Sequence, residues 1–265
     1  MGDLLTLALC WRIERRDGVT IGLTDHDRDL MVDGLLHRAA PGMVPSAIAR
    51  SDGLEADTME VTGALTSAAI GEDDLVAGRW DGAHVAMFAL DWASGGGRVE
   101  LGEGTIGAVE TKDGGFTAEL RGAAAAMDRA VVEETNATCR ATLGDRRCRV
   151  AMAPRRRFVR AVASEDVVLT LDRAEPSAGA YAHGLLRWMG GANCGLESAV
   201  AGSDGATVTL RLPPAFAVTA GTLVELVEGC DRTIATCAGR FGNAANFRGE
   251  PYLPGIDLLT RYPGA

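Results

Sequence analysis

The stretch LTLALCWRIERRDGVTIGL, residues 5–23, decides the fold class at the beginning of the chain. Its two apolar runs, Leu5 to Ile13 and Val19 to Leu23, flank Arg16-Asp17-Gly18. An Asp-Gly pair supplies a tight turn between antiparallel strands, because both residues tolerate the backbone angles that such turns need. The stretch therefore predicts a β-hairpin and indicates a chain built from strands.

Short apolar or alternating runs continue beyond the hairpin, whereas helix signals are few. In the first half we expect strands at Thr58 to Val61, His84 to Leu90, Val99 to Leu101, Thr105 to Thr111 and Phe116 to Leu120. Two segments favour a helix, Glu72 to Arg79 and Ala123 to Glu134. The first half is therefore predicted to be β-rich.

After Glu134 a polar, cysteine-containing stretch and an arginine run precede renewed strand signals. In this second half we expect strands at Phe158 to Ala163, Asp166 to Leu171, Gly184 to Met189, Thr207 to Leu212 and Thr222 to Val227. Many short strands without alternating helices are typical of barrels and sandwiches. We predict a mostly β protein with two β-barrel domains, residues 1–135 and 136–265, few short helices and a loop-like C-terminal tail.

Charge and hydropathy narrow the class of function. Lys and Arg number 26 against 36 Asp and Glu, and the net charge of -10 argues against a protein that grips nucleic acid. The N-terminus lacks the basic segment of a signal peptide, and no apolar run approaches the length that crosses a bilayer. We expect a soluble protein made in the cytoplasm, where six cysteines are more often thiols or metal ligands than disulfides.

Four of the cysteines form two pairs, Cys139-x8-Cys148 and Cys230-x6-Cys237, which bracket the second β-rich region. A compact barrel would bring its entry and exit close together, so the two pairs could meet. Four thiolates there could hold a tetrahedral metal ion or an iron–sulfur cluster, although zinc sites normally use shorter gaps within each pair. Buried thiols and a disulfide are the alternatives. Neighbouring arginines, among them Arg140, are expected to lower the pKa of the thiols.

Other candidate residues favour structural roles. Cys10 lies in an apolar strand and is expected in the core, whereas Cys194 lies in a loop and could serve as a reserve ligand. Asp25-His26-Asp27 is interpreted as a polar strand end rather than a metal site. Cys194 with His183 is the only pair that suggests a Cys/His peptidase, and no catalytic residue is assigned.

Long motifs near the C-terminus carry a family resemblance. They are Gly229-Cys230-Asp231-Arg232-Thr233-Ile234-Ala235-Thr236-Cys237, Arg240-Phe241-Gly242-Asn243 and the run from Asn246 to Gly255. Together with Gly22 to Leu30 and Leu54 to Gly63, they resemble the tail hub (baseplate hub) proteins of phages and gene transfer agents. The resemblance spans nearly the full chain.

The resemblance implies a structural, non-enzymatic hub at the distal end of a tail. Such a hub is a homo-oligomer, a trimeric ring of tube-like β-barrel domains. It joins the distal tail protein to fibre or cell-wall-penetrating tip proteins, contacts DNA only in transit, and is assembled into a virion or gene-transfer-agent-like particle without stable membrane insertion.

The related tail-tip proteins of lambda-like siphophages carry a four-iron, four-sulfur cluster on two cysteine pairs. That likeness implies Cys139, Cys148, Cys230 and Cys237 as the ligands of a 4Fe-4S cluster in this chain. A zinc-stapled assembly protein is the first alternative. The other is a small metal, redox or cysteine peptidase enzyme of the tail tip.

Overall fold

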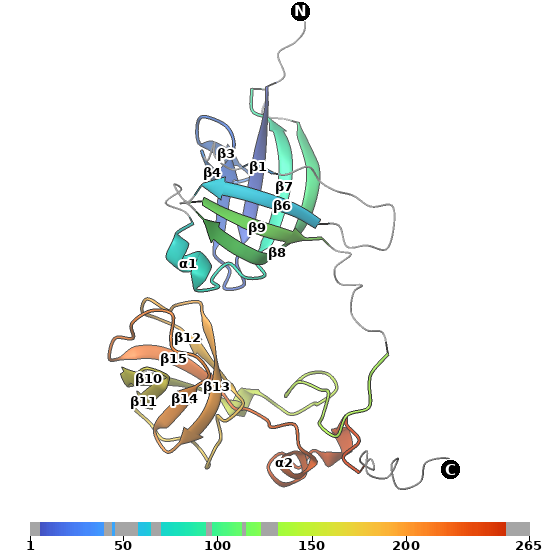
Figure 1. Ribbon diagram of the computed structural model, residues 1–265, viewed down its shortest axis with the longest axis vertical. Helices are drawn as coiled ribbons and strands as arrows, with labels where there is room; N and C mark the ends of the chain where they lie inside the picture. Colours follow the sequence, from blue (N-terminus) through green and yellow to red (C-terminus); the bar gives the residue numbers. More distant parts are fainter. Residues whose placement is uncertain are drawn as a thin grey trace, which may run out of the picture. The chain divides into compact units, whose positions relative to one another are not determined.

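The computed structural model describes residues 6–39, 44–45, 58–64, 70–93, 97–112, 115–122 and 132–252. The chain divides into two compact units, Met1–Val131 and Val132–Ala265, where the sequence had suggested a boundary between residues 135 and 136 (Figure 1). Strands dominate both units, so the predicted mostly β fold is confirmed. None of the helices in the described ranges is long and apolar enough to span a membrane.

Unit 1 is a nine-stranded sheet with the strand order β3-β4-β2-β1-β7-β8-β9-β6-β5. Its elements are β1 (Leu7–Glu14), β2 (Thr20–Thr24), β3 (Leu30–Val32), β4 (Leu35–Ala39), β5 (Val44–Pro45), β6 (Thr58–Ala64), α1 (Glu72–Val76), β7 (His84–Asp91), β8 (Arg98–Lys112) and β9 (Gly115–Arg121). The predicted hairpin forms, with Glu14 opposite Thr20. The predicted helix at 72–79 is shorter than expected. Of the second, residues 123–131 lie outside the described ranges and residues 132–134 are not helical.

The sheet of unit 1 curves around one apolar core. Trp11 and Ile13 of β1 are buried together with Leu120 of β9, although these two strands are not neighbours in the sheet. Strand β8 allows this curvature, because its pairing register shifts against both β7 and β9. The two short strands predicted in this region are therefore one long bent strand, and Figure 1 shows β6 and β9 crossing the direction of β1 and β7.

Two predictions about unit 1 are confirmed. Cys10 points to the opposite face of β1 and is fully buried with Val32 and Phe88, as a core residue. The Asp25-His26-Asp27 region is a network of strand-end hydrogen bonds. The Leu9 amide donates to Asp25 Oδ1 at 2.7 Å and the Arg28 amide donates to His26 Nδ1 at 3.0 Å.

Unit 2 contains a closed barrel with the strand order β10-β11-β14-β13-β12-β15. Its elements are η2 (Ala153–Arg155), β10 (Arg156–Glu165), β11 (Val168–Leu171), β12 (Leu185–Trp188), β13 (Glu197–Asp204), β14 (Thr207–Leu210), β15 (Thr222–Val227), α2 (Ile234–Gly239) and η3 (Ala244–Asn246). Trp188, Leu186 and Leu226 lie in its buried core. Strand β13 was not predicted, because small and polar residues mask the single inward Val200.

The first and last strands of the barrel are hydrogen-bonded neighbours. Arg156 at the start of β10 lies opposite Val227 at the end of β15. The chain therefore enters and leaves the barrel at one point. This pairing places the segments before β10 and after β15 beside each other.

Candidate metal centre

Two irregular segments outside the barrel carry the paired cysteines. We call residues 132–152 and 228–252 together the junction. Backbone hydrogen bonds join its two segments: the Cys139 amide donates to the Arg232 carbonyl at 2.9 Å, and the Arg140 amide donates to the Arg248 carbonyl at 2.9 Å. Two parts of the chain that are distant in sequence therefore lie side by side, next to the point where the chain enters and leaves the barrel.

All four cysteines of the junction line one small pocket. Cys139, Cys148, Cys230 and Cys237 share it with Ala141, Leu143, Val150, Phe241 and Asn243, among others. All six cysteines of the chain have free thiols, and those of Cys148 and Cys237 are buried. Cys194 is exposed on a loop and does not line the pocket, so it is not placed as a reserve ligand.

The surroundings of the thiols oppose ionisation in the absence of a cation. Burial raises the pKa of Cys230 and of Cys237, and the neighbouring cysteine sulfurs raise it further. The prediction that nearby arginines lower the pKa is wrong for these two thiols. The guanidinium of Arg140 is instead engaged by Glu133 and Glu250, and that of Arg147 by Glu133. A bound cation would be needed to hold several thiolates together here.

Three of the four sulfur atoms accept N–H hydrogen bonds. The Arg232 amide donates to Cys230 Sγ at 3.3 Å, and the Arg248 amide donates to Cys139 Sγ at 3.3 Å. The side-chain amide of Asn243 lies 3.7 Å from Cys148 Sγ. Hydrogen bonds of this kind stabilise negative charge on sulfur and tune metal-bound thiolates. The donor set therefore fits a thiolate-ligated group.

Asn243 links the two cysteine pairs to each other. Its side-chain Nδ2 donates to the Cys148 carbonyl at 2.6 Å, and its backbone amide donates to the Cys237 carbonyl at 2.9 Å. Asn246 holds this orientation, since its Nδ2 donates to Asn243 Oδ1 at 2.7 Å. One residue thus contacts one cysteine from each pair, Cys148 through its side chain and Cys237 through its backbone amide.

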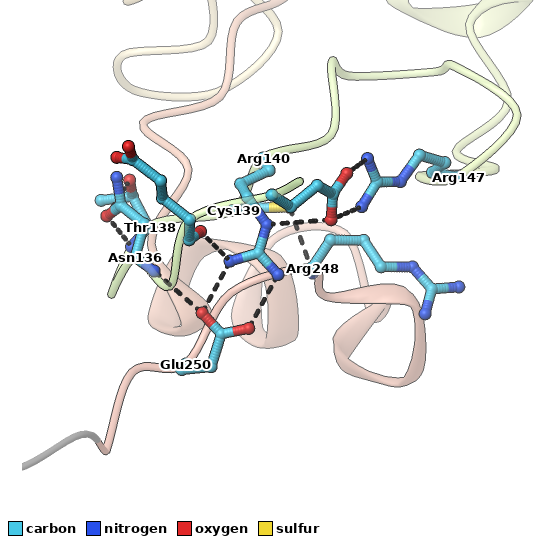
Figure 2. A network of polar contacts seen from close by, with 9 residues as sticks. Asn136, Thr138, Cys139, Arg140, Arg147, Arg248 and Glu250 are labelled. Carbon is cyan, nitrogen blue, oxygen red and sulfur yellow. Dashed lines mark hydrogen bonds and ion pairs between the residues drawn. The ribbon is translucent and has the colours of Figure 1, made fainter. Parts of the chain in front are cut away.

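A charged cluster closes the outer side of the junction (Figure 2). The Arg140 guanidinium donates to both carboxylate oxygens of Glu250, at 2.6 and 2.7 Å. The Asn136 amide donates to the same carboxylate at 2.9 Å. The Arg140 guanidinium and this amide together lower the pKa of Glu250 to about 2. Glu133 bridges Arg140 to Arg147 in the same cluster.

Arg240 attaches the junction to the barrel. The buried Glu228 carboxylate accepts from Arg240 at 2.8 Å and from Arg155 at 2.7 Å. Arg240 also donates to the Ala180 carbonyl at 2.7 Å, and both guanidiniums lie over the ring of Phe241. The α2 segment is thereby held against the barrel.

The four thiols are not arranged as a closed single-ion site. Within the described ranges, no group of three or more His, Cys, Asp or Glu side chains could hold a metal ion as placed. The peptidase alternative also lacks support there, since no hydrogen bond joins Cys194 to His183 among the described residues.

Sequence reasoning found the cysteines but missed the residues that position them. Asn243, Arg240 and Glu250 lie in the C-terminal motifs quoted above. The sequence therefore contained these residues in recognisable motifs, but it did not show which groups they contact. Gly249 in the same run lies against the first segment, where an added Cβ would stand 2.5 Å from the Thr138 carbonyl oxygen. The motif residues thus make the contacts between the two segments.

A closed β-barrel whose entry and exit segments carry four cysteines around one pocket, together with a separate β unit, defines a mostly β protein of two units. The family model "Baseplate hub protein, N-terminal attachment domain" matches residues 1–151, which include the first cysteine pair. "Phage conserved hypothetical protein BR0599" matches residues 179–257, which include the second pair. The chain belongs to the baseplate hub protein family.

A solved structure is similar over almost the whole length. It is a chain of the "Virion of native gene transfer agent (GTA) particle", 36% identical, with 99% of this chain and 93% of that chain covered and a TM-score of 0.86. No curated protein matches this chain. The recognition of a tail hub family from sequence is therefore confirmed.

Proposed function

We propose that this protein is a structural hub at the distal end of a phage-like or gene-transfer-agent tail, with a 4Fe-4S cluster in its junction. Membership of the baseplate hub family and the likeness to a chain of a gene transfer agent virion support the location. The observation that carries the cluster is the single pocket lined by Cys139, Cys148, Cys230 and Cys237.

An iron–sulfur cluster fits this pocket better than a single zinc ion. Zinc needs four ligands converging on one atom, and the described side chains do not present that arrangement. In a 4Fe-4S cluster each thiolate binds a different iron at the edge of a larger object. The N–H donors to the sulfur atoms of Cys139, Cys148 and Cys230 suit an anionic cluster.

The role of the cluster is mechanical. The junction contains a short α-helix and one 3-10 turn but no strand among its described residues, and side-chain hydrogen bonds make many of its contacts. When bound, the cluster supplies metal–sulfur bonds between the segment before the barrel and the segment after it. With all four positions taken by cysteines, no coordination site is left for a substrate, which favours structure over catalysis.

As a hub, the chain assembles as a homo-oligomer, a trimeric ring that lines the DNA channel. It joins the distal tail protein to the fibre or tip proteins. The net charge of -10 suits a wall past which DNA slides without being held. The family resemblance supports these partners.

Metal analysis of anaerobically purified protein tests the cluster. We expect about four irons and four sulfides per chain, with visible absorption. Cys237→Ser should lose the iron, and the matched control Cys194→Ser should retain it. Zinc in place of iron would contradict the 4Fe-4S cluster. It would still agree with a metal that joins the two segments of the junction.

Particle assembly tests the mechanical role. Cys230→Ser and Cys237→Ser should each abolish tail assembly, whereas Cys194→Ser should leave the yield unchanged. Normal particle yield from both junction variants would count against a role for the cluster in holding the hub together.

A further inference from the structure

A cleft of about 690 Å³ opens on unit 2 beside the cysteine pocket. One wall is the loop that precedes the barrel, with Asp145 and Met152. The other wall comes from the barrel and its exit, and it includes Arg187, Arg211 and Arg232. Arg232 lines both this cleft and the cysteine pocket, so the two cavities share a wall.

The cations of this cleft are only partly neutralised. Arg187 donates to Glu197 at 2.7 Å and to Glu225 at 3.2 Å, and Arg156 lies 3.8 Å from Glu225. The guanidiniums of Arg211 and Arg232 have no ion pair or hydrogen bond within the described part of the chain, and both residues are exposed. The cleft therefore presents two free guanidiniums to solvent.

The acidic residues that line the cleft are committed to internal donors. The Asp145 carboxylate accepts backbone N–H groups from Thr142 and Cys148 at 2.8 and 2.6 Å. The Asp231 carboxylate accepts from the Thr233 amide and the Thr236 hydroxyl at 2.9 and 2.8 Å. Glu228 is engaged by two arginines, as described above. The donors to Asp145 and Asp231 are neutral, so both carboxylates keep their charge, but neither they nor Glu228 forms an ion pair with Arg211 or Arg232 within the described part of the chain.

We propose that this cleft binds an acidic polypeptide segment of a partner protein through Arg211 and Arg232. A side-chain carboxylate is a compact anion that a guanidinium binds with two parallel hydrogen bonds. Unit 2 already uses this pairing, because Arg140 binds Glu250 in that way. The inference concerns unit 2 alone and does not depend on which metal fills the cysteine pocket.

The charge distribution favours a peptide over nucleic acid as the occupant. Residues 132–265 hold 15 arginines and 14 acidic residues, which is no basic footprint for a phosphate backbone. Within the cleft, Asp145 and Asp231 interrupt the row of arginines. The phosphates of a nucleic acid lie in its backbone and would meet those carboxylates, whereas glutamate side chains are flexible and can turn toward the arginines and away from Asp145 and Asp231.

Fluorescence polarisation of a labelled hexaglutamate peptide with the full chain tests the proposal. We expect saturable binding that weakens as salt rises from about 0.05 to about 0.15 M, since the pairs are exposed. Arg211→Glu should weaken binding at least tenfold. Arg173→Glu makes the same charge change at an exposed arginine outside the cleft and should bind like the unmodified chain. Hexaglutamine peptide should not bind.

Three results would overturn the proposal: no saturable binding, equal loss in Arg211→Glu and Arg173→Glu, or a single-stranded oligothymidylate that binds more tightly than the peptide. Arg211→Gln, which removes the charge without reversing it, covers the case in which Arg211→Glu does not fold. Iron content measured on the same samples separates failure of this inference from failure of the proposed cluster.

Discussion

The barrel and the junction belong to the same unit but are stabilised in different ways. The barrel has a closed ladder of paired strands around a continuous apolar core that includes Trp188 and Leu226. In the junction, side-chain hydrogen bonds and a pocket lined by four cysteines replace such a core. Apolar burial needs no ligand, whereas the raised pKa values of Cys230 and Cys237 make thiolates there unfavourable unless a cation binds them. Under the proposed function, the barrel should therefore fold without a cofactor, and the junction should need one.

The junction depends on the barrel for the placement of its two segments, whereas the core of the barrel does not depend on the junction. Pairing of Arg156 with Val227 places the two junction segments beside each other through contacts of the barrel alone. The junction, in contrast, supplies none of the residues of the barrel's buried core. Damage to the junction should therefore stay local, and damage to the barrel should spread to the junction.

Removal of the metal should give the largest effect and break the junction alone. A structural metal contributes on the order of 10 kcal/mol, so chelation or Cys237→Ser should leave residues 132–152 and 228–252 almost without protection from hydrogen exchange. Amides of β10 to β15 should keep their protection. Equal loss of protection in the strands would show that the barrel needs the cluster.

Truncation of the barrel core should damage both regions. Trp188 is 2% exposed, so Trp188→Ala should lower the free energy of unfolding by about 3–5 kcal/mol and reduce metal content as well. Leu212→Ala is the control, because Leu212 is 75% exposed and should cost less than about 0.5 kcal/mol. Thermal denaturation and iron content measure the two effects; a destabilised barrel with full iron occupancy would contradict the dependence.

A single methyl group at Gly249 should separate the two junction segments. Its Cβ would lie 2.5 Å from the Thr138 carbonyl oxygen, and backbone must move to accept it, so Gly249→Ala should destabilise the junction by about 1–3 kcal/mol. Gly239→Ala makes the same change where no atom lies within 4 Å. Local hydrogen exchange near Cys139 should rise in the first variant and stay unchanged in the second.

Regular burial in the strands also explains which parts of the fold could be predicted from the sequence. Strands with alternating apolar residues were found, because burial of one face leaves a period of two. Strand β13 was missed, since its inward Val200 stands among small and polar residues. In β8, shifts of register break the alternation, and the sequence therefore indicated two strands in place of one.

In the junction, sequence reasoning identified the residues whose role follows from their own side chain. It missed the residues whose role depends on their neighbours in the folded chain. Cysteine spacing left metal ligation open beside buried thiols and a disulfide, and the family resemblance implied Cys139, Cys148, Cys230 and Cys237 as ligands. The partners of Asn243 and Glu250 could not be inferred, since they depend on which carbonyl or guanidinium the folded chain places opposite. The pKa of Cys230 and of Cys237 was predicted in the wrong direction, because burial in the folded chain, which the sequence does not show, raises it.

The smallest expected effect concerns the half-buried ion pair between Arg140 and Glu250, whose loss at low pH should affect the junction and not the barrel. The pKa of Glu250 is lowered from about 4.5 to about 2, so the folded state binds fewer protons than the unfolded state between these values. The stabilisation by this carboxylate is complete above pH 4.5 and is lost as the pH falls toward 2.

Glu250→Gln should therefore weaken the junction at neutral pH and flatten its acid dependence in that range, with barrel amides unaffected. Salt should diminish the difference, because solvent still reaches both side chains of the pair. Glu165→Gln removes an exposed carboxylate in β10 for which no ion pair is found in the described part of the chain, and it should leave the acid dependence of the junction intact. Hydrogen exchange near Arg140 between pH 2 and 5 measures the effect, and parallel acid profiles for Glu250→Gln and the unmodified chain would show that Glu250 does not stabilise the junction.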